Sequence, residues 1–138
     1  MHGDPELPSP HLQRRIREVQ AYLQANLHRD VDLRSIAQEA ALSPFYFSRA
    51  FTAYVGTPPY RYLIRLRVER AQELLRTSEL TITQICQRVG FNSLSHFTTT
   101  FRRHTGVSPT SFRRALEHGA RYSAATDALV HRPRRLHI

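Results

Sequence analysis

The sequence predicts an all-α fold of seven helices, in which a two-helix unit occurs twice and a long helix connects the two copies. Three observations predict this fold. Apolar residues recur at intervals of about one helical turn, Ser, Thr, Gly and Pro punctuate the apolar stretches, and no window alternates apolar and polar residues as a strand would. The chain has 138 residues, which suits one compact unit or two very small ones.

Four helices are expected in the first half of the chain. Ser9, Asp32 and Ser43 can each cap a helix, because their side-chain oxygens accept from the free backbone N–H groups of the first turn. Gly56 is placed to end the third helix in the left-handed conformation. The predicted bounds are about 10–28, 33–41, 44–55 and 58–77.

Three helices are expected in the second half. Thr81 and Gln84 form a capping-box pattern, and Gly90 and Gly106 break the chain after the next two apolar stretches. The predicted helices cover about 82–88, about 93–104 and a short segment near Phe112.

Residues 36–62 repeat at 85–112. The first matched positions are 49 residues apart and the later ones 50 apart, so one residue is inserted near Asn92. The repeat includes the glycine and proline positions as well as the apolar spacing, which favours a true duplication. The matched pairs are Ile36/Ile85, Ala37/Cys86, Leu42/Phe91, Phe47/Phe97, Phe51/Phe101, Gly56/Gly106, Pro59/Pro109 and Tyr62/Phe112. A short helix, a tight turn and a longer helix are the outline of a helix-turn-helix motif, here at about 33–55 and 82–104.

The charge of the chain points to a polyanionic partner. Basic residues exceed acidic ones by 20 to 11, and every basic residue is arginine. The stretch 80–116 has no Asp or Glu but has five arginines. Cys86 is the only cysteine, so an internal disulfide is excluded, and no apolar run approaches the roughly 20 residues of a membrane span. We therefore expect a soluble protein of a reducing cytoplasm, without a membrane partner.

The outer faces of the third and sixth helices follow by subtraction, because the phenylalanines assign the inner faces. The second helix of such a motif enters the major groove of DNA. On the third helix the outward residues are Phe45, Ser48, Arg49 and Thr52. On the sixth they are Ser95, His96, Thr98, Thr99 and Arg102, with Thr100 and Arg103 flanking. A connecting helix of about 20 residues is about 30 Å long, close to the roughly 34 Å between successive major-groove segments.

The duplicated motif, the connecting helix YLIRLRVERAQELL and the segment GFNSLSHFTTTFRRHTGVSPTSFRR resemble the DNA-binding domain of the AraC/XylS family of bacterial transcription regulators. The resemblance covers about residues 13–115, within a domain predicted at 10–115 between an extension (1–9) and a tail (116–138). It implies that the third and sixth helices occupy adjacent major-groove segments, and that the protein activates transcription beside RNA polymerase. A single chain would bind DNA as a monomer unless a missing sensor domain dimerises it.

The resemblance also implies which residues contact DNA. The base-reading positions are Phe45, Ser48, Arg49, Leu94, Ser95, His96, Thr98 and Thr99, and the phosphate contacts are Thr52, Arg102 and Arg103. Many family members have arginine or another long polar residue where this chain has Thr99, so readout by the second motif is expected to be weaker. Most members also carry a sensor domain; this chain resembles the single-domain activators or is a fragment of a larger regulator.

Several residues have a second interpretation. Leu94 lies at helical spacing from Phe97, which favours packing, and Phe45 could either pack or enter the groove. The arginines of the connecting helix, which are Arg65, Arg67, Arg70 and Arg76, are expected on a solvated face rather than on phosphate. Arg132, Arg134 and Arg135 of the tail could attract DNA nonspecifically.

Two other classes of function stay open. The same DNA-binding unit occurs in repair enzymes that use a reactive cysteine, but Cys86 is expected to be buried and no catalytic constellation accompanies it. The eight histidines show no metal-ligand spacing, so no catalytic residue, metal or cofactor is predicted. An adaptor that binds protein without binding DNA is the third class.

Overall fold

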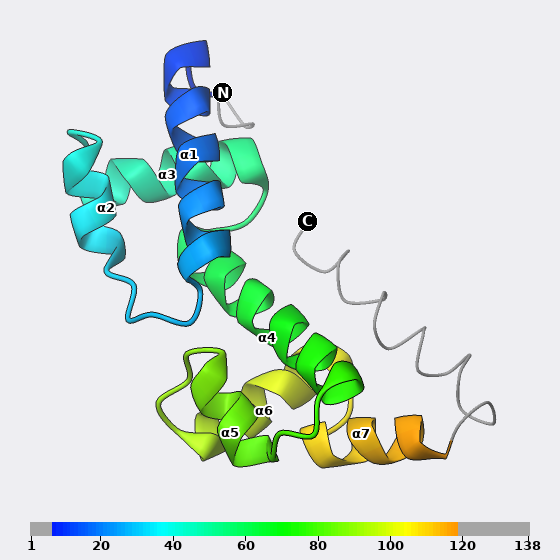
Figure 1. Cartoon of the computed structure of the whole chain (residues 1–138). Coiled ribbons are helices and arrows are strands. Elements are labelled where there is room, and N and C mark those ends of the chain that lie inside the picture. Colours follow the sequence, from blue (N-terminus) through cyan, green and yellow to red (C-terminus); the bar gives the residue numbers. More distant parts are fainter. Residues whose placement is uncertain (1–6, 119–138) are drawn as a thin grey trace. The chain divides into compact units, whose positions relative to one another are not determined.

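The computed structural model describes residues 7–118, and in that range it contains seven α-helices and no strand (Figure 1). The helices are α1 (Pro10–Asn26), α2 (Leu33–Glu39), α3 (Pro44–Val55), α4 (Pro59–Thr77), α5 (Ile82–Arg88), α6 (Leu94–Thr105) and α7 (Pro109–Glu117). The predicted all-α fold is confirmed, and the first six helices agree with their predicted bounds to within two residues. Most of the predicted tail, including Arg132, Arg134 and Arg135, lies outside the described residues.

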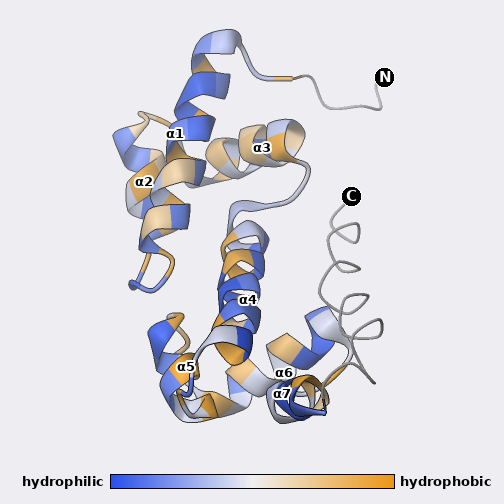
Figure 2. Cartoon of the chain, turned by 45° about the vertical axis from the view of Figure 1, so that its right-hand side comes forward, coloured by the Kyte–Doolittle hydropathy of each residue, from blue (hydrophilic) through white to orange (hydrophobic). Residues whose placement is uncertain are grey.

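The chain forms two compact units whose boundary falls inside α4, between Ile64 and Arg65. Each unit contains one helix-turn-helix motif: α2 and α3 in the first, α5 and α6 in the second. Hydrophobic and hydrophilic residues alternate around α4 in Figure 2, as expected of a helix that buries one side.

In the first unit, α3 packs against both α1 and α2. Phe47 and Phe51 of α3 are buried, with ring centroids 5.9 Å apart, and Phe51 meets Tyr62 of α4 edge-on at 5.6 Å. The Tyr62 hydroxyl also accepts a hydrogen bond of 2.9 Å from Gln24 Nε2 of α1. These contacts fix α3 by its inner face and leave its outer face to solvent.

In the second unit, α6 packs against α5 and α7. The buried rings of Phe97 and Phe101 are 5.8 Å apart, and Phe101 meets Phe112 of α7 edge-on at 5.6 Å. Phe91 adds a fourth buried ring, 5.2 Å from Phe97. The repeat predicted from the sequence is therefore also a repeat of packing, with matched residues making matched contacts.

The predicted caps are present. The side-chain oxygens of Ser9, Asp32 and Ser43 accept from backbone N–H groups of the following turn. Thr81 and Gln84 complete a reciprocal capping box, with hydrogen bonds of 3.1 and 2.9 Å. The glycines that end α3 and α6 are both left-handed, with φ of 97° at Gly56 and 90° at Gly106. Local sequence therefore sets the start of α1, α2, α3 and α5 and the end of α3 and α6.

Two expectations about faces are wrong. Thr100, predicted to flank the outer face of α6, is buried with 4% of its surface exposed. It precedes Phe101 on the helix and lies on the side that packs. Arg67, predicted on a solvated face of α4, is only 9% exposed, because an arginine can bury its aliphatic stem against apolar surface. Arg70 and Arg76 are exposed as predicted, and Arg70 pairs with Glu73 at 3.1 Å.

Candidate nucleic-acid interface

The outer face of α3 carries large side chains at its N-terminal end. Phe45 is 70% exposed, Arg49 is exposed one turn later, and Ser48 between them is half-buried. The Ser43 hydroxyl accepts from the Tyr46 backbone N–H at 3.1 Å, which fixes the first turn beneath these side chains. Of the two interpretations predicted for Phe45, packing into the core is therefore wrong, and an outward position remains.

Phe45 and Arg49 contact each other. The guanidinium carbon of Arg49 lies 5.6 Å from the centroid of the Phe45 ring, within the range of a cation–π interaction. Residues four apart on a helix lie above one another on the same face, so the pair forms one patch on α3.

Thr52 is half-buried at the next turn of α3, and its hydroxyl donates to the Ser48 carbonyl at 2.7 Å. A phosphate oxygen can only accept a hydrogen bond. The phosphate contact predicted for Thr52 therefore requires its hydroxyl to turn away from Ser48.

The outer face of α6 carries shorter side chains. Leu94 is 45% exposed, against the packing role that its spacing favoured. Ser95, His96 and Thr99 are exposed and Thr98 is half-buried. The structure thus places all five predicted base-reading residues of the second motif on or beside one face of α6.

His96 is the most constrained of these residues. Its ring meets the buried ring of Phe91 edge-on, with centroids 5.3 Å apart, and its backbone N–H donates to the Ser93 hydroxyl at 3.1 Å. Both contacts hold the imidazole at the start of α6, with part of its surface open to solvent.

The arginines of the acid-free stretch have different surroundings. Arg102 and Arg103 are exposed in the last turn of α6, and among residues 7–118 no carboxylate pairs with either. Arg113 is half-buried instead, and its guanidinium donates to the backbone carbonyls of Leu75, Ser78 and Leu80. Arg113 therefore stabilises the C-terminal end of α4 and the loop after it, whereas Arg88 and Arg114 of the same stretch are exposed like Arg102 and Arg103.

Tyr46 was not predicted, although it is 52% exposed beside Phe45. The signal was in the repeat: Tyr46 stands 50 residues before His96, a predicted base reader. We add Tyr46 to the candidate interface on that basis.

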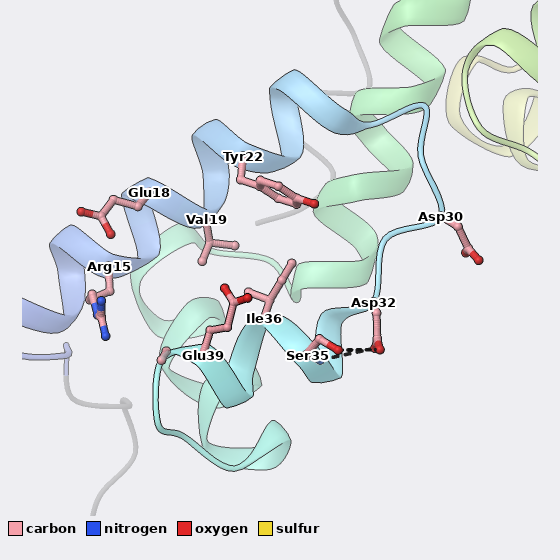
Figure 3. Close-up of a pocket in the computed structure, with 10 residues that line it drawn as sticks. Arg15, Glu18, Val19, Tyr22, Asp30, Asp32, Ser35, Ile36 and Glu39 are labelled. Carbon is pink, nitrogen blue, oxygen red and sulfur yellow. Dashed lines mark hydrogen bonds between the residues drawn. The ribbon is translucent and has the colours of Figure 1, made fainter.

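A separate surface in the first unit is acidic. A cavity of about 430 Å³ lies between α1 and α2, and Figure 3 shows its carboxylates around an apolar floor of Val19 and Ile36. The acidic residues that line it are Glu18, Asp30, Asp32 and Glu39. Arg15 also lines the cavity, but the four carboxylates outnumber its single guanidinium, and the resulting charge disfavours phosphate.

A metal site, a membrane span or a reactive cysteine would each require particular features in residues 7–118. No group of three His, Cys, Asp or Glu side chains there could hold a metal ion, and none of the helices found there is long and apolar enough to cross a bilayer. Cys86 is buried as predicted, and its desolvation raises the pKa of the thiol. A raised pKa disfavours the reactive thiolate.

Residues 36–115 match a protein family described as "Helix-turn-helix domain". Among curated proteins, the chain is 33% identical over 109 residues to the regulatory protein PocR of Salmonella typhimurium, an alignment that covers 79% of this chain and 36% of PocR. It is 34% identical over 99 residues to the HTH-type transcriptional activator RhaS of Salmonella schwarzengrund, which covers 72% of this chain and 36% of RhaS.

Solved structures agree with these relatives. The C-terminal domain of AraT, a response regulator from Geobacillus stearothermophilus, superposes with a TM-score of 0.70 at 36% identity, over 77% of this chain and 85% of that one. The DNA-binding domain of AdpA in complex with a target DNA gives a TM-score of 0.70 at 34% identity, over 80% and 94% of the two chains.

The chain belongs to the AraC family of transcription regulators. The predicted family is therefore confirmed, and with it the class of DNA-binding regulator. The chain spans about a third of the length of the curated relatives it matches, so their full activities extend beyond the segment compared.

Proposed function

We propose that this chain binds duplex DNA at specific sequences and activates bacterial transcription, with α3 and α6 in adjacent major-groove segments. One observation carries the proposal: each motif begins its second helix with a satisfied N-cap, buries two phenylalanines on the inner face and leaves the N-terminal outer face open. That part of the second helix is the one that reads base edges in helix-turn-helix proteins.

The proposed roles follow the chemistry of the side chains. Arg49 can donate two hydrogen bonds to the O6 and N7 atoms of a guanine. Threonine can offer a methyl group to thymine or a hydroxyl to a base edge, and exposed arginines bind phosphates. The base-reading set is Phe45, Ser48, Arg49, Leu94, Ser95, His96, Thr98 and Thr99, and the phosphate set is Thr52, Arg102 and Arg103.

Activation and its partners are part of the same proposal. The relative RhaS is named a transcriptional activator, which supports activation. RNA polymerase as a partner and the cytoplasm as location belong to the proposal. Two motifs in one chain support binding as a monomer, unless a sensor domain outside this sequence brings two copies together. The proposed role needs neither catalysis nor a cofactor, because hydrogen bonds and apolar contacts to bases and phosphates are enough for DNA recognition. The buried Cys86 thiol, with its raised pKa, is a poor nucleophile.

Selection of binding sites from random duplex DNA at moderate salt tests the proposal. We expect a selected site with two half-sites about 10 base pairs apart, as two motifs in successive major-groove segments require. A single short half-site would contradict the two-helix arrangement. Retardation of no duplex at all would favour an adaptor that binds only protein.

A further inference from the structure

Phe45 and Arg49 are both exposed, yet neither is loose. The Phe45 ring shows 70% of its surface to solvent, and the Arg49 guanidinium carbon lies 5.6 Å from its centroid. Among residues 7–118 no carboxylate pairs with Arg49, so the ring is the group that the structure places against its charge. An arginine has several rotatable bonds, and a contact that restricts them in the free protein reduces the entropy lost on binding.

We propose that Phe45 is a positioning residue for Arg49, and that the pair reads a guanine with a thymine at the neighbouring base pair. The inference rests on the proposed function, in which α3 enters the major groove. The guanidinium offers parallel donors to guanine, and the exposed edge of the ring offers an apolar contact to the thymine C5 methyl. Stacked base pairs are about 3.4 Å apart, so two groups separated by 5.6 Å reach the same or adjacent pairs.

The second motif offers a control within the chain. Ser95 and Thr99 occupy the positions of Phe45 and Arg49, and neither an aromatic ring nor a cation is present at either position. The guanine–thymine preference is therefore expected in one half-site only, the one bound by α3.

The first test measures preference for guanine. With the selected site as probe, Phe45→Leu should lower the affinity ratio between guanine and the other bases at the Arg49 position by about two- to five-fold, the range of an exposed cation–π contact. Phe45→Tyr keeps a ring and should retain the preference. In an Arg49→Ala background, Phe45→Leu should leave the ratio unchanged. If Phe45→Leu, with Arg49 still present, lost the same affinity for all four bases at that position, the positioning role would be overturned.

The second test removes single chemical groups from the DNA. Thymine-to-uracil exchange deletes only the methyl group and should weaken the wild-type protein several-fold but leave Phe45→Ala unaffected. Replacing guanine by 7-deazaguanine removes the N7 acceptor and should have no effect on Arg49→Ala. An equal effect of uracil on the wild type and Phe45→Ala would refute the thymine contact.

The controls separate this inference from the proposed function. Phe45 lies outside the core, so its variants should keep the wild-type circular dichroism and melting temperature. If the wild-type protein binds no duplex, the proposed function fails. If it binds a selected site but Phe45→Leu and uracil change nothing, only the inference about this pair fails.

Discussion

The inner faces of the two helix-turn-helix motifs are nearly identical, whereas their outer faces share little. Phe47 and Phe51 in α3 are 5.9 Å apart, and Phe97 and Phe101 in α6 are 5.8 Å apart. On the outside, Arg49 of α3 is replaced by Thr99 in α6. Packing to near-crystalline density limits change in the core, and that limit does not apply to side chains exposed to solvent.

The outer faces divide the work of binding differently. The first motif has an aromatic–arginine pair at its start and neutral residues, Thr52 and Ala53, near its end. The second has short side chains at its start and exposed Arg102 and Arg103 at those later positions. We therefore expect α3 to supply most base discrimination and α6 to supply most phosphate attraction.

The largest effect should come from the matched core rings. Phe51→Ala and Phe101→Ala should each lower the free energy of unfolding by about 3–5 kcal/mol, because each removes the central ring of three and opens a cavity between the other two. Urea denaturation measures the loss, and amide exchange assigns it to α2–α3 or to α5–α6. Phe45→Ala is the matched exposed control. If Phe101→Ala lost much less free energy of unfolding than Phe51→Ala, the two cores would not be energetically equivalent.

The second effect concerns DNA rather than folding. Arg49→Ala should cost about 1–3 kcal/mol of binding free energy and relax the preference at one base position. Thr99→Ala should cost less, because the side chain it removes is shorter. Quantitative gel retardation on the selected site and on its single-base variants provides the measurement.

Arg102→Ala serves as the phosphate control. It should weaken binding to all sequences alike and make the slope of log affinity against log salt shallower by about one. Arg49 would be reassigned to phosphate if its variant gave that result, and Arg102 would lose its role if the slope did not change.

Most of the fold was predictable because its signals are local. Serine, aspartate and glycine at helix ends, and phenylalanines four apart, determine boundaries and inner faces within a few residues of themselves. The surroundings of Arg113 could not be predicted in that way. Its three carbonyl partners lie 33–38 residues earlier in the sequence, and only the packed structure brings them together.

The candidate interface was predicted by subtraction, which works where a residue has one clear face. It placed Arg49 and Thr99 outside as observed, and it failed at Thr100, which is buried like Ala50 at the matched position of α3. It also omitted Tyr46, because a tyrosine between two phenylalanines looks like part of an apolar cluster. Comparison with His96 in the repeat would have corrected that omission.

The turn between the helices gives the fourth prediction. Ala41 is left-handed with φ of 61°, where the matched residue of the second motif is Gly90 with φ of 96°. In both turns the next N–H donates back to a matched carbonyl, Leu42 to Ala37 at 3.0 Å and Phe91 to Cys86 at 3.1 Å. A residue with a Cβ is strained there, and glycine is not.

Exchanging alanine and glycine at these two positions should change the stability of the two units in opposite directions. Gly90→Ala should destabilise the second unit by roughly 1–2 kcal/mol. Ala41→Gly should stabilise the first by up to about 1 kcal/mol, since relief of strain exceeds the entropy of the added glycine. Urea denaturation of both variants measures these changes. If Ala41→Gly lowered the free energy of unfolding, the entropy that glycine adds to the unfolded chain would outweigh the relief of strain.

The smallest expected effect is a difference between the two motifs in how their stability depends on pH. Asp32 caps α2, and its hydrogen bond from the Ser35 side chain lowers the pKa of the carboxyl below its ordinary value of 3.8. A lowered folded pKa means that the stabilisation is present above the ordinary value and is lost as pH falls through the lowered one. Thr81, which caps α5, does not titrate in this range.

Amide exchange measured between pH 5 and pH 3 should therefore show α2 losing protection more than α5. Asp32→Ser keeps an N-cap oxygen without an acidic proton, so it should remove the difference between the helices while leaving α2 formed. The comparison needs intrinsic exchange rates corrected for pH at each step. If α2 of Asp32→Ser still lost protection in acid, the Asp32 cap would not be the source of the pH sensitivity.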